Sequence, residues 1–140
     1  MSELERFGIS VDRRLLDEFD KRNKEMGYEN RSEAIRDLIR DCLVRKKQWA
    51  KDNVRVVASV TLIYDHHTGE LTDRLNDIKH QHAKLVVSSM HVHLDRDNCL
   101  EVVVLRGMGK DVKLLAHEMI AQKGVKHGKA IVTTEGKDLW

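Results

Sequence analysis

Two histidines and a cysteine lie close together between His91 and Cys99. The runs on either side are rich in β-branched and apolar residues, and residues 95–98 between them are turn formers. This pattern predicts a β-hairpin with a four-residue loop. Because strand side chains alternate between faces, His91 and His93 share one side, and Cys99 opens the returning strand near His93. Two imidazoles and a thiol on one hairpin indicate three ligands of a late-transition-metal site, with a fourth missing.

Other interpretations of these three residues stay open. A half-exposed strand can carry two polar histidines, and a free cysteine often packs as a small hydrophobe. A cysteine beside two histidines could also serve an enzyme, as a nucleophile with a base or as part of a catalytic zinc site. No well-placed carboxylate accompanies the cluster as a general base, since the turn explains Asp95 and Asp97 better. We therefore expect a metal site and no enzymatic activity.

The fourth ligand can be sought on the segment from Leu71 to about Leu85, whose apolar residues have helical spacing. On a helix, residues 71, 75, 78, 82 and 85 fall within about 40° of one direction, whereas His80 points about 180° away. His80 can therefore reach another subunit more easily than its own sheet, as a bridging ligand would. His82 either falls on the core face or lies past a helix that ends early.

The composition limits the class of protein. The chain has 140 residues, a formal net charge of +2 and two cysteines, Cys42 and Cys99, in different settings. No apolar run approaches the roughly 20 residues of a membrane span, and no signal-peptide pattern is present. We expect a cytoplasmic protein without a disulfide framework and without a membrane partner. Any contact with DNA must come from the local placement of basic groups.

The first fifty residues predict one strand followed by two helices. Residues 6–11 alternate between apolar and polar side chains, Asp12 is an N-cap for a first helix, and Asn30 is an N-cap for a second. One strand and two helices bury too little surface to fold alone. We therefore expect two copies to share a core, with their strands paired antiparallel into a ribbon.

This half of the chain resembles a ribbon-helix-helix DNA-binding domain in its order of elements and in the run from Gly27 to Arg36. The resemblance implies that such a ribbon enters the major groove of DNA, where the polar face of the strand would meet base edges. Arg6 and Ser10 offer side chains for this contact, whereas Gly8 offers none, and a solvated edge is the alternative for the first two. The backbone amides at the start of the second helix would suit a phosphate. These amides lie near Asn30, Arg31 and Ser32.

The second half predicts the order βαββαβ, which indicates a ferredoxin-like sandwich with both helices on one face of the sheet. A second copy is the expected cover for the other face. The predicted domains are residues 1–48 and 54–140, joined by a linker at 49–53.

The order of elements in the first half and the run from Gly27 to Arg36 resemble the ribbon-helix-helix DNA-binding domain. Joined to a βαββαβ domain with His-x-His and a cysteine, the chain resembles the nickel-responsive transcriptional repressors, the NikR family. The most specific matching segments are residues 30–37, 91–101 and 124–128.

The resemblance implies an α+β fold in which N-terminal ribbon-helix-helix domains form a swapped dimer and C-terminal domains tetramerise. The homotetramer would be a dimer of dimers. Each subunit would bind one Ni(II) in a square-planar site, through His91, His93 and Cys99 of one chain and His80 of another. A metal-free ribbon-helix-helix repressor whose C-terminal domain senses an amino acid is the alternative.

The resemblance also implies how the metal is used. The nickel-loaded protein would bind operator DNA and shut off nickel-uptake genes. Arg6 and Ser10 match base-reading positions, and Gly8 stands where the family has a polar residue. Glu33 and Asp37 match positions that hold a secondary cation between the two domains in the DNA-bound form.

Overall fold

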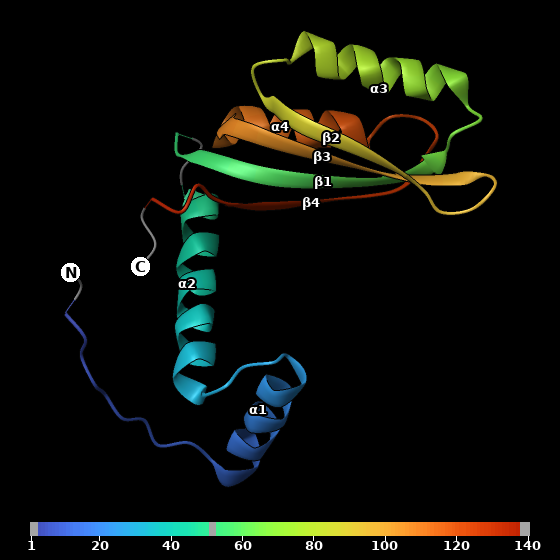
Figure 1. Ribbon diagram of the computed structural model, residues 1–140. Coiled ribbons are helices and arrows are strands. Elements are labelled where there is room, and N and C mark those ends of the chain that lie inside the picture. Colours follow the sequence, from blue (N-terminus) through green and yellow to red (C-terminus); the bar gives the residue numbers. More distant parts are fainter. Residues whose placement is uncertain (1–2, 51–52, 138–140) are drawn as a thin grey trace. The chain divides into compact units, whose positions relative to one another are not determined.

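The computed structural model describes residues 3–50 and 53–137, with residues 46–50 described by their backbone alone (Figure 1). The described chain divides into two compact units, residues 3–44 and 45–137. The predicted linker, residues 49–53, contains residues 51–52, which lie outside the described part, so the predicted domain boundaries stay a prediction. None of the helices in the described ranges has the length and apolar character needed to cross a bilayer.

Two helices, α1 and α2, follow the N-terminal segment; they span Arg13–Glu25 and Arg31–Ala50. Asp12 caps α1, because its carboxylate accepts a hydrogen bond of 2.9 Å from the backbone N–H of Arg14. Asn30 caps α2, because its side-chain oxygen accepts a hydrogen bond of 3.0 Å from the N–H of Glu33. Each cap satisfies an N–H group that the first helical turn leaves without a partner. Both predicted helix starts are confirmed.

The segment before α1 is an extended trace that forms no strand between residues 3 and 12 (Figure 1). Its apolar side chains face solvent, with Phe7 69% exposed and Ile9 66% exposed. A strand needs a neighbour to pair with its backbone groups, and among the residues that the structure describes this segment pairs with no other strand. The predicted strand is therefore absent from the single chain, and its pairing with a second copy stays a prediction.

The second unit is a four-stranded sheet with two helices. In chain order its elements are β1 (Arg55–Asp65), α3 (Gly69–Gln81), β2 (Val86–His93), β3 (Asn98–Met108), α4 (Gly109–Ile120) and β4 (Val125–Thr134). The strands lie in the order β2-β3-β1-β4, and every neighbouring pair is antiparallel. Figure 1 shows α3 and α4 on the same side of the sheet. This is the predicted ferredoxin-like arrangement, and the α+β class is confirmed.

The core of this unit lies between the sheet and the two helices. It is built from alternate residues of β1 and β3, because strand side chains alternate between faces, and from the apolar stripes of α3 and α4. The residues of β1 and β3 in it are Val56, Ala58, Val60, Leu62, Tyr64, Cys99, Val103 and Leu105. The edge strand β2 leaves the apolar side chains of Val87 and Met90 exposed.

Helix α3 ends at Gln81, earlier than the predicted end near Leu85. His82 has φ −115°, outside the helical range, and its N–H still bonds to the carbonyl of Ile78. Of the two placements expected for His82, the structure has the one past the helix. Leu85 instead packs against the core, and its carbonyl accepts a hydrogen bond of 2.8 Å from the N–H of Arg106. Leu85 therefore belongs to the segment that leads into β2 and not to the helix.

Strand β4 begins at Val125, and helix α4 ends at Ile120. Between them Gly124 has φ +103°, a conformation that side chains with a Cβ rarely adopt. The glycine lets the chain reverse directly from the helix into the edge strand.

Candidate metal centre

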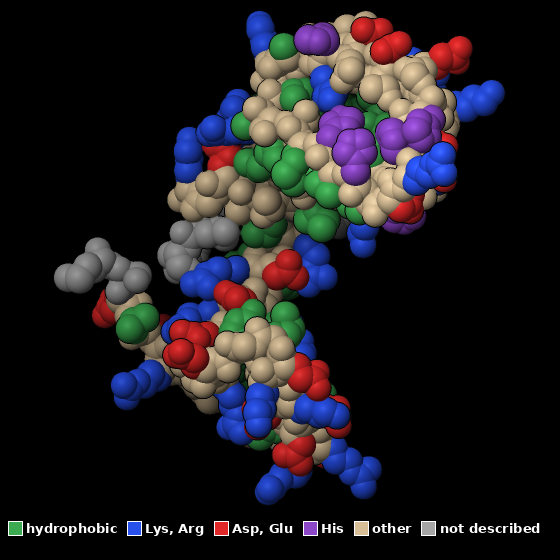
Figure 2. All heavy atoms as spheres, turned by 45° about the vertical axis from the view of Figure 1, so that its right-hand side comes forward, with side chains coloured by type: hydrophobic (Ala, Val, Ile, Leu, Met, Phe, Trp, Pro, Cys, Tyr) green, Lys and Arg blue, Asp and Glu red, His purple; other side chains and the backbone are tan. Residues whose placement is uncertain are grey.

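The hairpin of β2 and β3 brings the three predicted ligands together on one face of the sheet. His93 pairs with Cys99 across the hairpin, and His91 pairs with Glu101. Residues that face each other in an antiparallel pair point to the same side, which here is the side covered by the helices. Cys99 is buried, whereas the two histidines are exposed at the edge of the sheet. Figure 2 shows histidine side chains gathered on one face of this unit.

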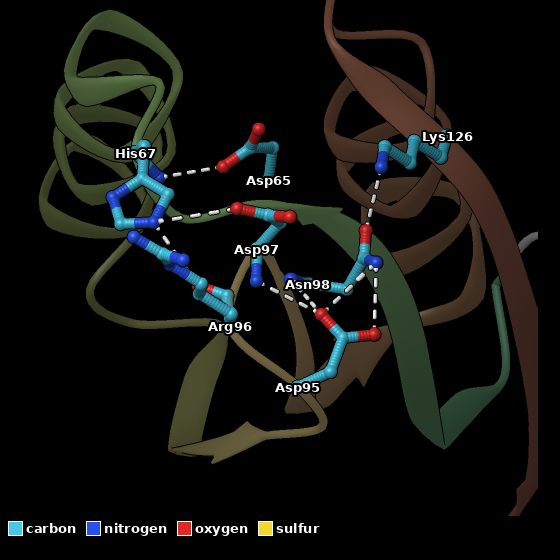
Figure 3. Close-up of polar contacts among 7 residues, drawn as sticks. All are labelled: Asp65, His67, Asp95, Arg96, Asp97, Asn98 and Lys126. Atoms are coloured by element: carbon cyan, nitrogen blue, oxygen red, sulfur yellow. Dashed lines mark hydrogen bonds and ion pairs between the residues drawn. The ribbon is translucent and has the colours of Figure 1, made fainter.

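The turn between the two strands is held by Asp95. Its carboxylate accepts hydrogen bonds from the backbone N–H groups of Asp97 (2.9 Å) and Asn98 (2.8 Å), and from the Asn98 side chain (Figure 3). The Asn98 side chain, together with these N–H groups, lowers the pKa of Asp95 to about 2. Lys126 of β4 bonds to the same Asn98 at 2.6 Å. Asp95 therefore has the structural role that the sequence indicated, and it fixes the spacing of His93 and Cys99.

Cys99 occupies a fully enclosed position between β2 and β1, where its partner in β1 is Tyr64. Burial raises the pKa of the Cys99 thiol, and the nearby Tyr64 hydroxyl only partly offsets this effect. The thiolate is the form that binds a metal. A metal ion bound here must therefore displace the thiol proton, so its affinity depends on pH.

Glu101 is a residue of this site that the sequence interpretation did not single out. It is 1% exposed, and its carboxylate accepts hydrogen bonds from the Tyr64 hydroxyl (2.6 Å) and the Lys79 ammonium (2.5 Å). Oε2, the oxygen that accepts from Tyr64, also lies 3.2 Å from Nε2 of His91. Burial alone would raise the pKa of Glu101, but the bonds from Lys79 and Tyr64 outweigh it and hold the pKa below its usual value. The carboxylate stays charged inside the domain.

The position of Glu101 matters because carboxylates that hold a histidine fix which ring nitrogen can bind a metal. With Nε2 of His91 held by Glu101, Nδ1 is the nitrogen left for an ion. A signal for this role was present in the sequence. Residues 99, 101, 103 and 105 alternate onto one face, and a glutamate among apolar neighbours on a buried face requires a charged partner.

His80 lies near the C-terminal end of α3 with its side chain exposed, while its neighbour Lys79 reaches Glu101. The exposed position agrees with the expectation that His80 points away from its own core. Within residues 3–50 and 53–137, one group of three potential ligands has donor atoms within 4.8 Å of one another. The group consists of Asp65, His66 and His67. The hairpin ligands share a face without closing to that distance.

The hairpin residues nevertheless fit a nickel ion by their chemistry. Imidazole nitrogens and a thiolate are ligands preferred by nickel, copper and zinc. His91 carries a buried carboxylate partner of the kind that supports metal-bound histidines. The hairpin supplies three of the four predicted ligands. The fourth predicted ligand, His80, lies outside the hairpin, on α3.

The predicted DNA-contact residues lie in the first unit, on the surface. Arg6, Gly8 and Ser10 are exposed along the extended segment. At the start of α2, Ser32 is exposed, and the Arg31 guanidinium forms two hydrogen bonds to Asp20, of 2.8 and 2.7 Å.

The predicted secondary-cation residues lie one turn apart on α2. The Asp37 carboxylate already accepts hydrogen bonds from the Tyr28 hydroxyl (2.6 Å) and Arg40 (2.9 Å). The Tyr28 bond is the largest influence that lowers the pKa of Asp37. Glu33 is partly buried.

Each half of the chain matches the model of a known protein family. Residues 57–133 match the model of the NikR C-terminal nickel-binding domain, and residues 5–46 match that of the ribbon-helix-helix proteins of the copG family. The chain is 52% identical over 139 residues to a protein from Geobacter sulfurreducens named as a nickel-responsive regulator, covering 99% of each chain.

A protein of the same name from Pyrococcus horikoshii is 47% identical over 137 residues, covering 98% of this chain and 99% of the relative. These matches cover the whole fold and agree with a DNA-binding regulator rather than an enzyme or an amino-acid sensor. The chain therefore belongs to the family of nickel-responsive transcriptional regulators, in which a ribbon-helix-helix DNA-binding domain is joined to a nickel-binding domain.

Proposed function

We propose that this regulator is a nickel-dependent repressor that binds operator DNA when loaded with Ni(II) and shuts off nickel-uptake genes. The observation that carries the proposal is the hairpin of β2 and β3, which sets His91 and His93 beside the buried thiol of Cys99. This donor set is joined in one chain to a ribbon-helix-helix domain. A regulator of genomic DNA with reduced cysteines would work in the cytoplasm.

The proposed ligands are His91, His93 and Cys99 of one subunit and His80 of another, with one Ni(II) per subunit. The exposure of His80 on α3 supports a role between subunits. Glu101 would orient His91, and the Lys79–Glu101 ion pair would connect the end of α3 to the same site. The bound nickel would supply bonds that link two subunits.

The proposed DNA-binding unit is a dimer of N-terminal domains. The exposed Phe7 and Ile9 and the unpaired backbone of the extended segment support pairing with a second copy. Arg6 and Ser10 would then project into the major groove, while Gly8 leaves space between them. The amides near Asn30, Arg31 and Ser32 would bind phosphate. Two such dimers on a tetrameric C-terminal core would make a dimer of dimers.

The proposed secondary-cation residues, Glu33 and Asp37, are one helical turn apart on α2 and offer oxygen ligands. A cation held there in the DNA-bound form would have to compete with Tyr28 and Arg40 for the Asp37 carboxylate.

Nickel can act as a switch only if it binds the DNA-competent arrangement more tightly than the others. A ligand supplied by another subunit gives a route, because closing that bond restricts how the C-terminal core holds the N-terminal dimers. The coupling is reciprocal, so operator DNA should raise the nickel affinity by the same factor by which nickel raises the DNA affinity.

A mobility-shift assay with the full chain and DNA from upstream of its own gene tests the proposal. We expect a specific shift with nickel and a much weaker one without it. Cys99→Ala should abolish the nickel response together with the thiolate charge-transfer absorption, whereas His117→Ala, which alters an exposed histidine on α4, should leave both intact. Equal DNA binding with and without nickel would show that the metal has only a structural role.

A further inference from the structure

Helix α3 carries His80, and another residue of the same helix connects it to a distant part of the chain. Arg74 is partly buried, and its guanidinium reaches the turn between α4 and β4 (Figure 1). Its Nε donates to the side-chain oxygen of Gln122 at 3.2 Å, and a terminal nitrogen donates to the backbone carbonyl of Lys123 at 2.5 Å. Both acceptors follow the end of α4 at Ile120. Arg74 therefore joins α3 to the end of α4.

The end of α4 is a suitable place for a guanidinium. The last turn of a helix leaves carbonyl groups without partners inside the helix, and a cation there meets the negative end of the helix dipole. Gln122 takes part in the same arrangement, because its Nε2 donates to the carbonyl of Glu118 at 3.0 Å while its oxygen accepts from Arg74. The planar guanidinium has donors in fixed directions. Arg74 thus sets the direction and the distance of α3 from this turn.

The C-terminal end of α3 has a polar contact of its own, from Lys79 to the buried carboxylate of Glu101. The apolar side of the helix packs into the core through Leu71, Leu75 and Ile78. Apolar burial is non-directional, so it holds α3 on the sheet without fixing its position along its own axis. The two polar contacts are directional, and five residues separate Arg74 from Lys79, about 7.5 Å along the helix. Together they fix both the shift and the rotation of α3.

The position of α3 matters because His80 projects from its last turn. A nitrogen ligand must come within about 2.1 Å of its ion, so a small shift of the helix decides whether His80 can reach a metal. Lys79 bonds to Glu101, which also holds His91 of the same chain. Among the described residues, Arg74 bonds to the α4–β4 turn and not to the hairpin. Arg74 therefore affects His80 without touching the hairpin ligands of its own chain.

We propose that Arg74 is a positioning residue for the ligand that each chain gives to another subunit. Its contacts with Gln122 and Lys123 hold α3 where His80 meets the hairpin of a second chain. This inference rests on the proposed ligation of nickel between subunits. Loss of the guanidinium should weaken nickel binding by about tenfold, the smaller effect seen when a group that supports a metal ligand is removed. The loss should follow the chain that gives His80 and not the chain that gives the hairpin.

Mixed tetramers of full-length chains can assign the effect to one of the two roles. Cys99→Ala chains can give His80 but have no complete hairpin, whereas His80→Ala chains can give only the hairpin. Nickel titrations of this mixture, followed by thiolate charge-transfer absorption, measure the affinity of the shared sites. Adding Arg74→Met to the Cys99→Ala chains should weaken that affinity by about tenfold. Adding Arg74→Met to the His80→Ala chains instead should leave it unchanged.

Lys110→Met, at an exposed lysine in the first turn of α4, removes the same charge and should change neither mixture. Arg74→Lys keeps the charge but not the fixed pair of donors, so it should cause a smaller loss on the same chain. It carries the comparison if Arg74→Met chains do not fold.

The proposal is overturned if the substitution at Arg74 has no effect in either mixture. It is also overturned if both mixtures weaken equally, since Arg74 would then support the whole domain rather than His80. Absence of shared sites in the mixture without any change at Arg74 would be a different result. It would refute ligation between subunits by His80, and the role of Arg74 with it.

Discussion

Replacing Glu101 by Gln tests whether the buried carboxylate organises the core and the nickel site. Its side chain is 1% exposed and holds the Tyr64 hydroxyl, the Lys79 ammonium and Nε2 of His91. Glutamine has almost the same shape but no charge. The substitution therefore leaves the ammonium of Lys79, whose side chain is 14% exposed, without its anionic partner.

Removing one member of a buried ion pair costs about 3–5 kcal/mol, because the other charge stays buried alone. Lys79 keeps some contact with water, and the glutamine oxygen can still accept one of the hydrogen bonds. We therefore expect Glu101→Gln to lower the free energy of unfolding of the metal-free protein by about 2–3 kcal/mol. The double variant Glu101→Gln/Lys79→Met should lose less than the sum of the two single losses, since it buries no unpaired charge.

Urea unfolding followed by circular dichroism, at pH 7 and at one protein concentration, measures these free energies. Nickel affinity should also fall by about 10–100-fold in Glu101→Gln, because His91 loses the carboxylate that holds its ring. A change in unfolding free energy below about 0.5 kcal/mol, the size of an ordinary surface substitution, would refute the reasoning. So would strictly additive losses in the double variant.

Three further predictions concern assembly, DNA and pH. Mixing His80→Ala chains with Cys99→Ala chains should restore some complete nickel sites in mixed tetramers, as measured by charge-transfer absorption; no recovery would mean that His80 serves its own subunit or is no ligand. Arg6→Ala should reduce discrimination between operator variants by about 1–3 kcal/mol in mobility shifts, with nickel binding unchanged; unaltered operator preference would place Arg6 outside the groove. The pKa of Glu135 is lowered to about 2 from 4.5, chiefly by its hydrogen bond to Arg106, so its stabilising effect is present above pH 4.5 and is lost as the pH falls toward 2. Glu135→Gln should therefore be less stable than the unaltered protein at pH 7 but nearly equal to it near pH 2 in urea unfolding, and an equal deficit at both pH values would contradict this.

The sequence predicted the parts of the fold that depend on near neighbours along the chain. The N-caps at Asp12 and Asn30 follow from side-chain oxygens placed to bond the first turn of a helix. The alternation around His91 and His93 predicted one shared face, and the polar cluster at 95–98 predicted the turn that brings Cys99 back beside them. The order βαββαβ followed from the same local patterns, and the sheet has that topology.

Other features depend on contacts between residues far apart in the sequence, and local patterns do not contain them. The register of β1 against β3 sets Tyr64 beside Cys99 and lets Tyr64 bond to Glu101, and packing of α3 brings Lys79 to the same carboxylate. Past the end of α3 at Gln81, Leu85 packs against the core of the sheet, which the helical spacing of the sequence did not show.

The turn after β1 also shows the difference. Asp65, His66 and His67 are consecutive, so the sequence alone places their side chains near one another. Only the pairing of β1 with β3 sets that turn against the β2–β3 turn and brings the His66 ring to 4.9 Å from that of His93. The sequence alone thus determined the donor types and the faces on which they lie. The tertiary structure decided which donors meet, because strand register and helix packing fix distances that no local spacing encodes.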